Sequence, residues 1–166
     1  MKQEFFIMKK TVLSFAAIVS LFTLSAGSFT ADFEDQDVSK WMPFQKGETI
    51  SVSDQEPGSG KYSLQILSAG MKLKKSAFIP VVQGEKYTVS VNMRCSGKRV
   101  RMSFAEFDKA GEWLRGSTFY AAETRSRKWI TLKNTWTPRN PKAAFIVIQF
   151  DGDGFADDIK FNKLAK

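Results

Sequence analysis

Hydrophobic and polar residues alternate along two well-defined stretches of the chain. In residues 86–93 (KYTVSVNM) every second side chain is apolar, and the same alternation returns in residues 99–107 (RVRMSFAEF). A period of two with one polar face is typical of a half-buried β-strand. Shorter apolar stretches predict further strands at 62–67, 76–81, 128–136, 143–150 and 157–161.

Segments rich in glycine, proline and polar residues separate these predicted strands. They are EPGSG, VQGEK, CSGK, DKAGE, PRNP and DGDG, and each is typical of a turn. No stretch of a dozen residues keeps a helical period. Seven or more short strands at this spacing predict an all-β fold, an antiparallel β-sandwich.

The N-terminal part of the chain has a different pattern. Lys9 and Lys10 precede an uncharged run over residues 11–31, and small residues end its most apolar part. This order is typical of a secretory signal, although an apolar run of about 20 residues could also span a membrane. We expect residues 1–27 to be a signal peptide and residues 28–166 a single domain. The protein would then be secreted or periplasmic, without membrane insertion after cleavage.

Composition removes several kinds of chemistry. The chain has no histidine and a single cysteine, Cys95, within 166 residues of formal net charge +8. An internal disulfide is therefore impossible, although an exported protein could form one. The absence of histidine excludes the usual general base, the usual zinc ligand and the serine-protease triad.

An acidic segment, DGDGFADDIKF, ends this basic chain. It does not fit an EF-hand loop beginning at Asp151, because Phe155, Ala156 and Asn162 occupy positions that need an oxygen ligand, glycine and glutamate. We expect DGDG to form a turn and FADDIKF a strand. The alternation would direct Asp157 inward with Ile159, and an inward carboxylate needs a cation or several hydrogen-bond donors.

The order of several short fragments resembles a known family. ADFEDQDVSKW, GSGKYSLQI, FIPVVQGEKYTVSVNMR, TWTP and GDGFADDIKF follow one another across residues 32–162. This order is similar to the carbohydrate-binding modules of the xylan- and β-glucan-binding (CenC-like) type. The resemblance implies an antiparallel jelly-roll β-sandwich, like that of galactose-binding domains.

The resemblance also implies a structural calcium between the first and last strands. Glu34 and Asp157 match the family's acidic ligands, and carbonyl groups around Ser59, Gly60 and Lys61 would complete an oxygen shell. The alternative is an Asp157 carboxylate bonded to backbone amides or to a lysine. The neighbouring acids Asp35 and Asp158 are expected to be solvated.

Sugar recognition needs flat aromatic surface for the sugar rings and polar groups for the hydroxyls. Family members bind sugars across a sheet face or in a loop-built site, so for this chain the ligand-binding candidates are Trp113, Tyr120, Asn92, Arg94, Arg101 and Gln149. Trp113 is the preferred single candidate, while Trp129 and Trp136 are expected in the core. The many arginines make an acidic polysaccharide as suitable a ligand as a neutral one.

Three other functions compete with this hypothesis. An enzyme could use Glu106, Glu112 or Glu123, but Glu106 falls on the core side of its strand and the others have a solvated context. Nucleic-acid binding fits the basic charge but not export. We therefore predict a secreted, non-catalytic module that binds a polysaccharide or oligosaccharide, with an extracellular or envelope protein-interaction domain, and hence a protein partner, as the alternative.

Overall fold

The computed structural model describes residues 27–55 and 57–165, so the expected signal peptide, apart from Gly27, lies outside the described residues. The described part forms a ten-stranded antiparallel sheet with one short 3-10 helix, η1 (Lys75–Ala77). Its strands are β1 (Phe29–Ala31), β2 (Trp41–Pro43), β3 (Val52–Ser53), β4 (Ser63–Ile66), β5 (Met71–Leu73), β6 (Ile79–Pro80), β7 (Tyr87–Phe107), β8 (Phe119–Thr124), β9 (Ile130–Trp136) and β10 (Phe145–Lys163). No helix in these residues is long and apolar enough to cross a membrane.

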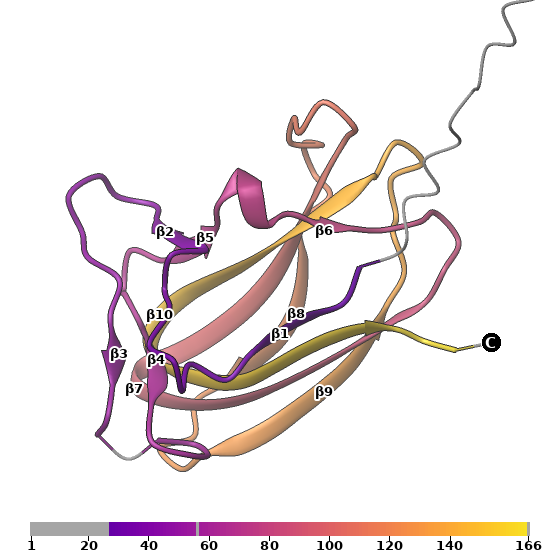
Figure 1. The fold of residues 1–166 in the computed structure, drawn as a ribbon. Helices are drawn as coiled ribbons and strands as arrows, with labels where there is room; N and C mark the ends of the chain where they lie inside the picture. The colour runs from indigo at the N-terminus through magenta and orange to yellow at the C-terminus, as the bar shows by residue number, and fades with distance from the viewer. Residues whose placement is uncertain (1–26, 56, 166) are drawn as a thin grey trace, which may run out of the picture.

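Strands β7 and β10 pair along almost their whole length and double back at the same end of the molecule (Figure 1). Each strand therefore contributes to two layers. The upper layer contains β8, β7 from Val100, β10 as far as Gly152, and β5, β6 and β2. The lower layer contains β9, β7 as far as Cys95, β10 from Gly154, and β1, β4 and β3. The predicted antiparallel sandwich is confirmed.

Two of the predicted turns are instead bends within continuous strands. CSGK lies inside β7 and DGDG inside β10, so four predicted strands are two long ones. The pairing shifts between Gly152 and Gly154, which is a β-bulge. Gly152 has φ +93°, and a Cβ there would lie 2.2 Å from the carbonyl oxygen of Arg99. Glycine allows the bend because any larger residue would collide with the facing backbone.

Smaller departures from the predicted elements occur in two loops. The predicted strand at 76–81 is reduced to β6 and follows η1, because proline at position 80 and the tight turn before it limit the pairing. The irregular stretch after β7 contains β8, which pairs with the upper half of β7.

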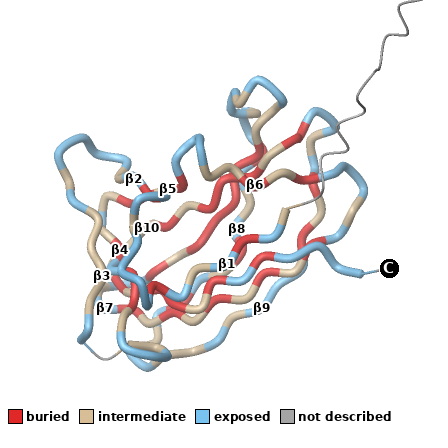
Figure 2. The backbone as a smooth tube through the Cα atoms, in the orientation of Figure 1, coloured by how far each residue is buried: buried red, intermediate tan, exposed pale blue. Residues whose placement is uncertain are grey.

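The core fills the space between the two layers, and buried positions follow their inner faces (Figure 2). Tyr87 stacks on Phe161 at 5.0 Å between ring centroids, and Phe104 packs edge-on against Phe161 and Trp136. Trp136 is buried as expected. Trp129 is only half-buried, which corrects its expected place in the core, because it lies on the lower layer against Gly58.

Candidate functional site

Asp157 lies at a break in one edge of β10. Strand β4 pairs with residues 154–156 of this edge and β1 with residues 159–161, so Asp157 and Asp158 occupy the gap. Asp158 has φ +47°, and the pairing with β7 shifts here. Directly paired residues share a face, so Asp157, opposite Asn92, faces away from Phe161, opposite Val89.

This bulge corrects the predicted strand phase. Asp157 does not share a face with Ile159, because the extra residue reverses the alternation between them. The predicted burial of the carboxylate is nevertheless confirmed, since Asp157 is fully buried. The cover is the segment 57–62 before β4, which we call the clasp loop.

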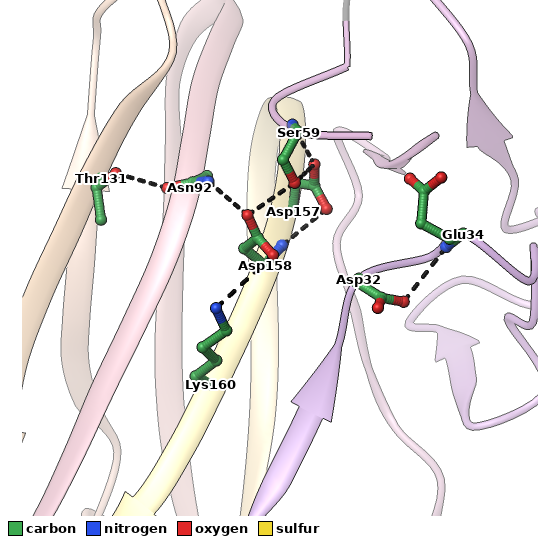
Figure 3. Close-up of polar contacts among 8 residues, drawn as sticks. All are labelled: Asp32, Glu34, Ser59, Asn92, Thr131, Asp157, Asp158 and Lys160. Carbon is green, nitrogen blue, oxygen red and sulfur yellow. Dashed lines mark hydrogen bonds and ion pairs between the residues drawn. The ribbon is translucent and has the colours of Figure 1, made fainter. Parts of the chain in front are cut away.

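The Asp157 carboxylate accepts three hydrogen bonds from backbone and side chain (Figure 3). The Ser59 amide and hydroxyl donate to Oδ2 at 2.8 and 3.2 Å, and the Asp158 amide donates to Oδ1 at 2.7 Å. Burial raises the pKa of the Asp157 carboxyl above its ordinary value, although these amide bonds act in the opposite direction. The site therefore holds a desolvated carboxylate.

Glu34 holds the other side of the clasp loop. It follows β1, and its carboxylate accepts the amides of Lys61 at 2.8 Å and Tyr62 at 3.0 Å. Gly60, at φ +56°, leaves the room this carboxylate needs, because a Cβ there would lie 2.3 Å from Oε1. The structure thus brings Glu34, Gly60, Lys61 and Asp157, the residues that the family resemblance implied, together around one loop.

Asp158 is not merely solvated, which corrects that expectation. Its Oδ2 accepts the Ser59 hydroxyl at 2.7 Å and the Asn92 amide at 3.0 Å, while Thr131 donates to Oδ1 of Asn92 at 2.6 Å (Figure 3). Asn92 is therefore part of a network that ties β9, β7 and β10 to the clasp loop. Its amide is engaged by the protein itself.

Arg94 lies on the outer face of the lower layer among aromatic rings. Its guanidinium is 4.5 Å from the ring centroid of Phe155 and 5.7 Å from that of Trp129, and it donates to the carbonyl of Gln55 at 3.2 Å. These contacts place the guanidinium near two aromatic rings and use part of its fork. Arg94 and Asn92 are thus separated from the other predicted ligand-binding residues, which belong to the upper layer.

Arg101, Tyr120 and Gln149 come together on the outer face of the upper layer. Strand register places Tyr120 opposite Ser103, Ser103 opposite Gln149, and Gln149 opposite Lys72. Because paired residues share a face, they form a row across β8, β7, β10 and β5. We call this surface, together with Arg101, the upper face.

The Tyr120 ring on the upper face has a fixed support. The Arg101 guanidinium lies 4.1 Å from its centroid and is held by Asp151, with Nε 3.0 Å from Oδ2. Tyr120 is still 59 % exposed. One side of the ring therefore rests on arginine while much of the ring remains open, an arrangement suited to stacking against a sugar.

Sequence reasoning missed Phe44 and Lys72 at the opposite edge of the upper face. Phe44 is 45 % exposed, contacts Gly70, and has the Lys72 ammonium 5.6 Å from its ring centroid. The short strands β2 and β5 carry too few residues to show alternation. The only signal available in the sequence was an aromatic residue directly after a proline, at Pro43 and Phe44.

Trp113 is exposed and lies on the upper layer beyond the row, toward the end of β7. It forms an isolated bridge with Phe107, four residues along β7 from Ser103, and is 50 % exposed. The preceding DKAGE segment is the expected turn, closed by the Asp108 carboxylate, which accepts the amides of Ala110 and Glu112 at 2.9 Å. Trp113 therefore stands near the end of the upper layer, next to the Phe78–Phe107 pair.

The lower layer carries an open groove of about 660 Å³. Lysine, hydroxyl and amide side chains dominate its lining, which includes Lys133, Lys160, Thr88 and Asn162 but no aromatic ring. Without such a ring the apolar faces of a sugar have no partner. The upper face is therefore the better candidate for glycan binding.

The three glutamates considered for catalysis do not form a pair across a cleft. Glu106 is fully buried, and its carboxylate accepts the amides of Arg139 at 2.6 Å and Asn140 at 2.9 Å. It holds the loop before β10 in place. Glu112 and Glu123 are exposed on other elements.

Comparisons with known proteins agree with this geometry. A family model described as a carbohydrate-binding domain (CBM_4_9) matches residues 26–153. No curated protein sequence matches the chain. Similar solved structures are xylan-binding modules at low sequence identity, so they show the fold.

Two of these modules come from Xyn10C of Paenibacillus barcinonensis. The chain is similar to the CBM22-1 domain at 13 % identity and TM-score 0.61, covering 83 % of this chain and 94 % of that one. The chain is similar to the CBM22-2 domain at 14 % identity and TM-score 0.62, covering 82 % of this chain and 99 % of that one. A third similar structure is that of the CBM22-1 and GH10 modules of Clostridium thermocellum xylanase 10B in complex with xylohexaose. The identity is 14 % and the TM-score 0.63, covering 82 % of this chain and 28 % of the xylanase chain.

Proposed function

Because the chain belongs to the carbohydrate-binding domain family, a family of non-catalytic binding modules, we propose that its upper face binds a polysaccharide. The expectation that the domain is not itself an enzyme is confirmed by this membership. The ligand class that we propose is xylan, either neutral or carrying acidic groups, since the structural neighbours are xylan-binding modules. We further propose that the protein is secreted.

The Tyr120–Arg101–Asp151 stack carries this proposal. A ring that is already oriented loses little conformational entropy when a sugar stacks on it. Gln149 and Lys72, in the same row, offer an amide and an ammonium to hydroxyl groups. Phe44 adds a second aromatic surface at the far edge.

Isothermal titration with soluble xylan and with xylo-oligosaccharides tests the proposal. Replacing Tyr120→Ala should weaken binding about tenfold, which corresponds to about 1.4 kcal/mol, while Tyr120→Phe should bind nearly as well as the original protein. Val82→Ala, another exposed apolar residue outside the upper face, is the matched control.

Two results would contradict the proposal. If Trp113→Ala abolishes binding and Tyr120→Ala does not, the glycan binds at the end of β7 rather than on the upper face. If no polysaccharide binds, while one envelope protein is recovered on the immobilised domain and lost with Tyr120→Ala, the same face serves a protein partner.

A structural calcium at the clasp loop is part of the proposal. The carboxylates of Glu34 and Asp157, with the Ser59 hydroxyl and nearby carbonyl groups, are hard oxygen donors of the kind calcium prefers. The described residues include no group of three or more His, Cys, Asp or Glu side chains placed to hold a metal ion, so carbonyl groups and water would supply the remaining ligands. Amide donors already contact both carboxylates, and calcium would replace part of this compensation.

Thermal unfolding with and without a chelator tests the metal. At a free calcium concentration of about 100 times the dissociation constant, bound calcium should add about 2.7 kcal/mol to the free energy of unfolding. Removing it with the chelator should therefore lower Tm by several degrees. Asp157→Ala should abolish this sensitivity, whereas Asp35→Ala, an exposed neighbour of Glu34, should retain it. Equal melting curves in chelator and in calcium would contradict the metal site. The backbone amides alone would then compensate the charges of the two carboxylates.

A further inference from the structure

Three cationic side chains surround an open pocket where β7 doubles back. Lys98, Arg99 and Arg125 line a cavity of about 520 Å³, and all three are exposed. No acidic residue lines it. We call this cavity the basic pocket.

The fold, rather than sequence proximity, places the two arginines together. Val100 pairs with Thr124 and Arg101 with Glu123, so Arg99 and Arg125 flank the next position of the same strand pair. The Arg99 backbone is packed against Gly152, and Arg127 donates from Nη1 to the Ser96 carbonyl. These contacts hold the backbone on both sides of the pocket in place.

The positive charge of the pocket is only partly compensated, with the Asp153 side chain packed against Gly97 next to Lys98. Asp151 is already bonded to Arg101 at 3.0 Å. Glu123 approaches Arg125 only at 4.0 Å, with both side chains well exposed, and such surface pairs contribute little. Within the described residues, neither Lys98 nor Arg99 forms an ion pair.

The basic pocket lies on the same strand pair, β7 and β8, as one end of the upper face. Arg99, Arg101 and Ser103 alternate along β7, so the distance from the pocket to the Tyr120 row is about 13 Å at 3.2–3.4 Å per residue. A single oligosaccharide chain stacked on Tyr120 is long enough to reach it. Arginine forks match carboxylates in shape and charge, and exposed arginine keeps its charge at every physiological pH.

We propose that the basic pocket binds carboxylate groups of a uronate-bearing polysaccharide whose neutral backbone lies on the upper face. This inference rests on the proposed function. It assigns the two surfaces different roles: Tyr120 contacts any suitable sugar chain, and Lys98, Arg99 and Arg125 select chains that carry acidic side groups.

Isothermal titration with glucuronoxylan and with the same polymer after reduction of its carboxyl groups to alcohols tests this division. The original protein should bind the acidic polymer about three to ten times more tightly at low salt, and the difference should vanish as salt rises. Arg99→Gln combined with Arg125→Gln should remove the preference and leave binding of the reduced polymer unchanged. Lys109→Gln combined with Arg115→Gln, with the same loss of charge on the exposed loop after β7, should retain it.

The outcomes separate the two proposals. Equal binding of both polymers overturns the role of the basic pocket in selecting acidic chains and leaves the polysaccharide-binding function intact. No binding of either polymer overturns the function itself. Binding of a single-stranded oligonucleotide as tightly as glucuronoxylan, lost in the Arg99 and Arg125 variant, would show a general polyanion surface and would also overturn the inference.

Discussion

At the scale of single residues, Asp157 shows how a carboxylate can be buried without pointing into a hydrophobic core. A bulge turns it away from the core face, and the clasp loop then covers it. Its amide partners offset part of the desolvation cost, and its pKa still lies above the ordinary value. The residue is therefore a titrating group with a definite effect on stability.

In chelator, the contribution of Asp157 to stability should fall as pH rises. Its folded pKa is raised, so the folded state binds the proton more tightly than the unfolded state does. The benefit is present below the unfolded pKa, about 4, and is lost as pH rises through the folded pKa. Urea unfolding from pH 3.5 to 7 should show Asp157→Asn gaining stability relative to the original protein. A constant difference across this range would contradict the prediction, and added calcium should weaken the trend.

Glu106 should matter for stability and not for binding. Glu106→Ala leaves the Arg139 and Asn140 amides without their acceptor in a buried site, at a cost of about 2–4 kcal/mol. The exposed Glu112→Ala is the control, with an expected change of less than about 0.5 kcal/mol. Denaturant midpoints measure both, and a similar midpoint for the two variants would count against the structural role.

At the scale of elements, the fold depends on two long strands that bend together and resume their pairing after the bend. Gly152→Ala should destabilise the protein by about 3 kcal/mol or more, because its Cβ meets the Arg99 carbonyl at φ +93°. Gly116→Ala, at φ +80° with no atom within 4 Å, is the matched control for backbone strain alone. Thermal unfolding should give the lower Tm for the Gly152 variant. Equal losses would mean that contact with Arg99 is unimportant.

The sequence predicted the faces of elements better than their connections. Alternation in 86–93 and 99–107 correctly separated inner residues such as Val91 and Phe104 from outer ones such as Arg101. It could not distinguish a turn from a bulge in CSGK or DGDG, because glycine permits both and only the facing strand decides. A separate bulge between Asp157 and Lys160, which no glycine marks in the sequence, reversed the predicted phase of Asp157.

The candidate site was predicted in part for a related reason. Arg101, Tyr120 and Gln149 do share one face, and Glu34 and Asp157 share one loop. Asn92 and Arg94 also sit at polar strand positions, but on the other layer, and single-strand alternation does not tell which layer a polar face belongs to. Lys72 was missed because its strand is too short to carry a pattern, and Phe44 because it follows an equally short strand.

At the scale of the whole molecule, the first and last described strands lie side by side in the lower layer. Deleting residues 27–31 should expose this edge of β10 and remove the buried Phe29, which costs about 3–5 kcal/mol. Deleting residues 165 and 166 is the control, with little expected effect. Chemical unfolding of the two deletions gives the comparison, and a β1 deletion as stable as the control would show that the strand is dispensable.

The pairing of β1 with β10 also has a mechanical consequence. Phe29 lies opposite Phe161 and Ala31 opposite Ile159, so the start of β1 and the end of β10 lie at the same end of the lower layer (Figure 1). Pulling the ends apart would load these hydrogen bonds one after another, as in opening a zipper, rather than all together in shear. After β1 has peeled away, tension reaches Glu34 and Asp157, which both hold the clasp loop. The bonds of the clasp loop to these two carboxylates would then be the first to resist the applied force.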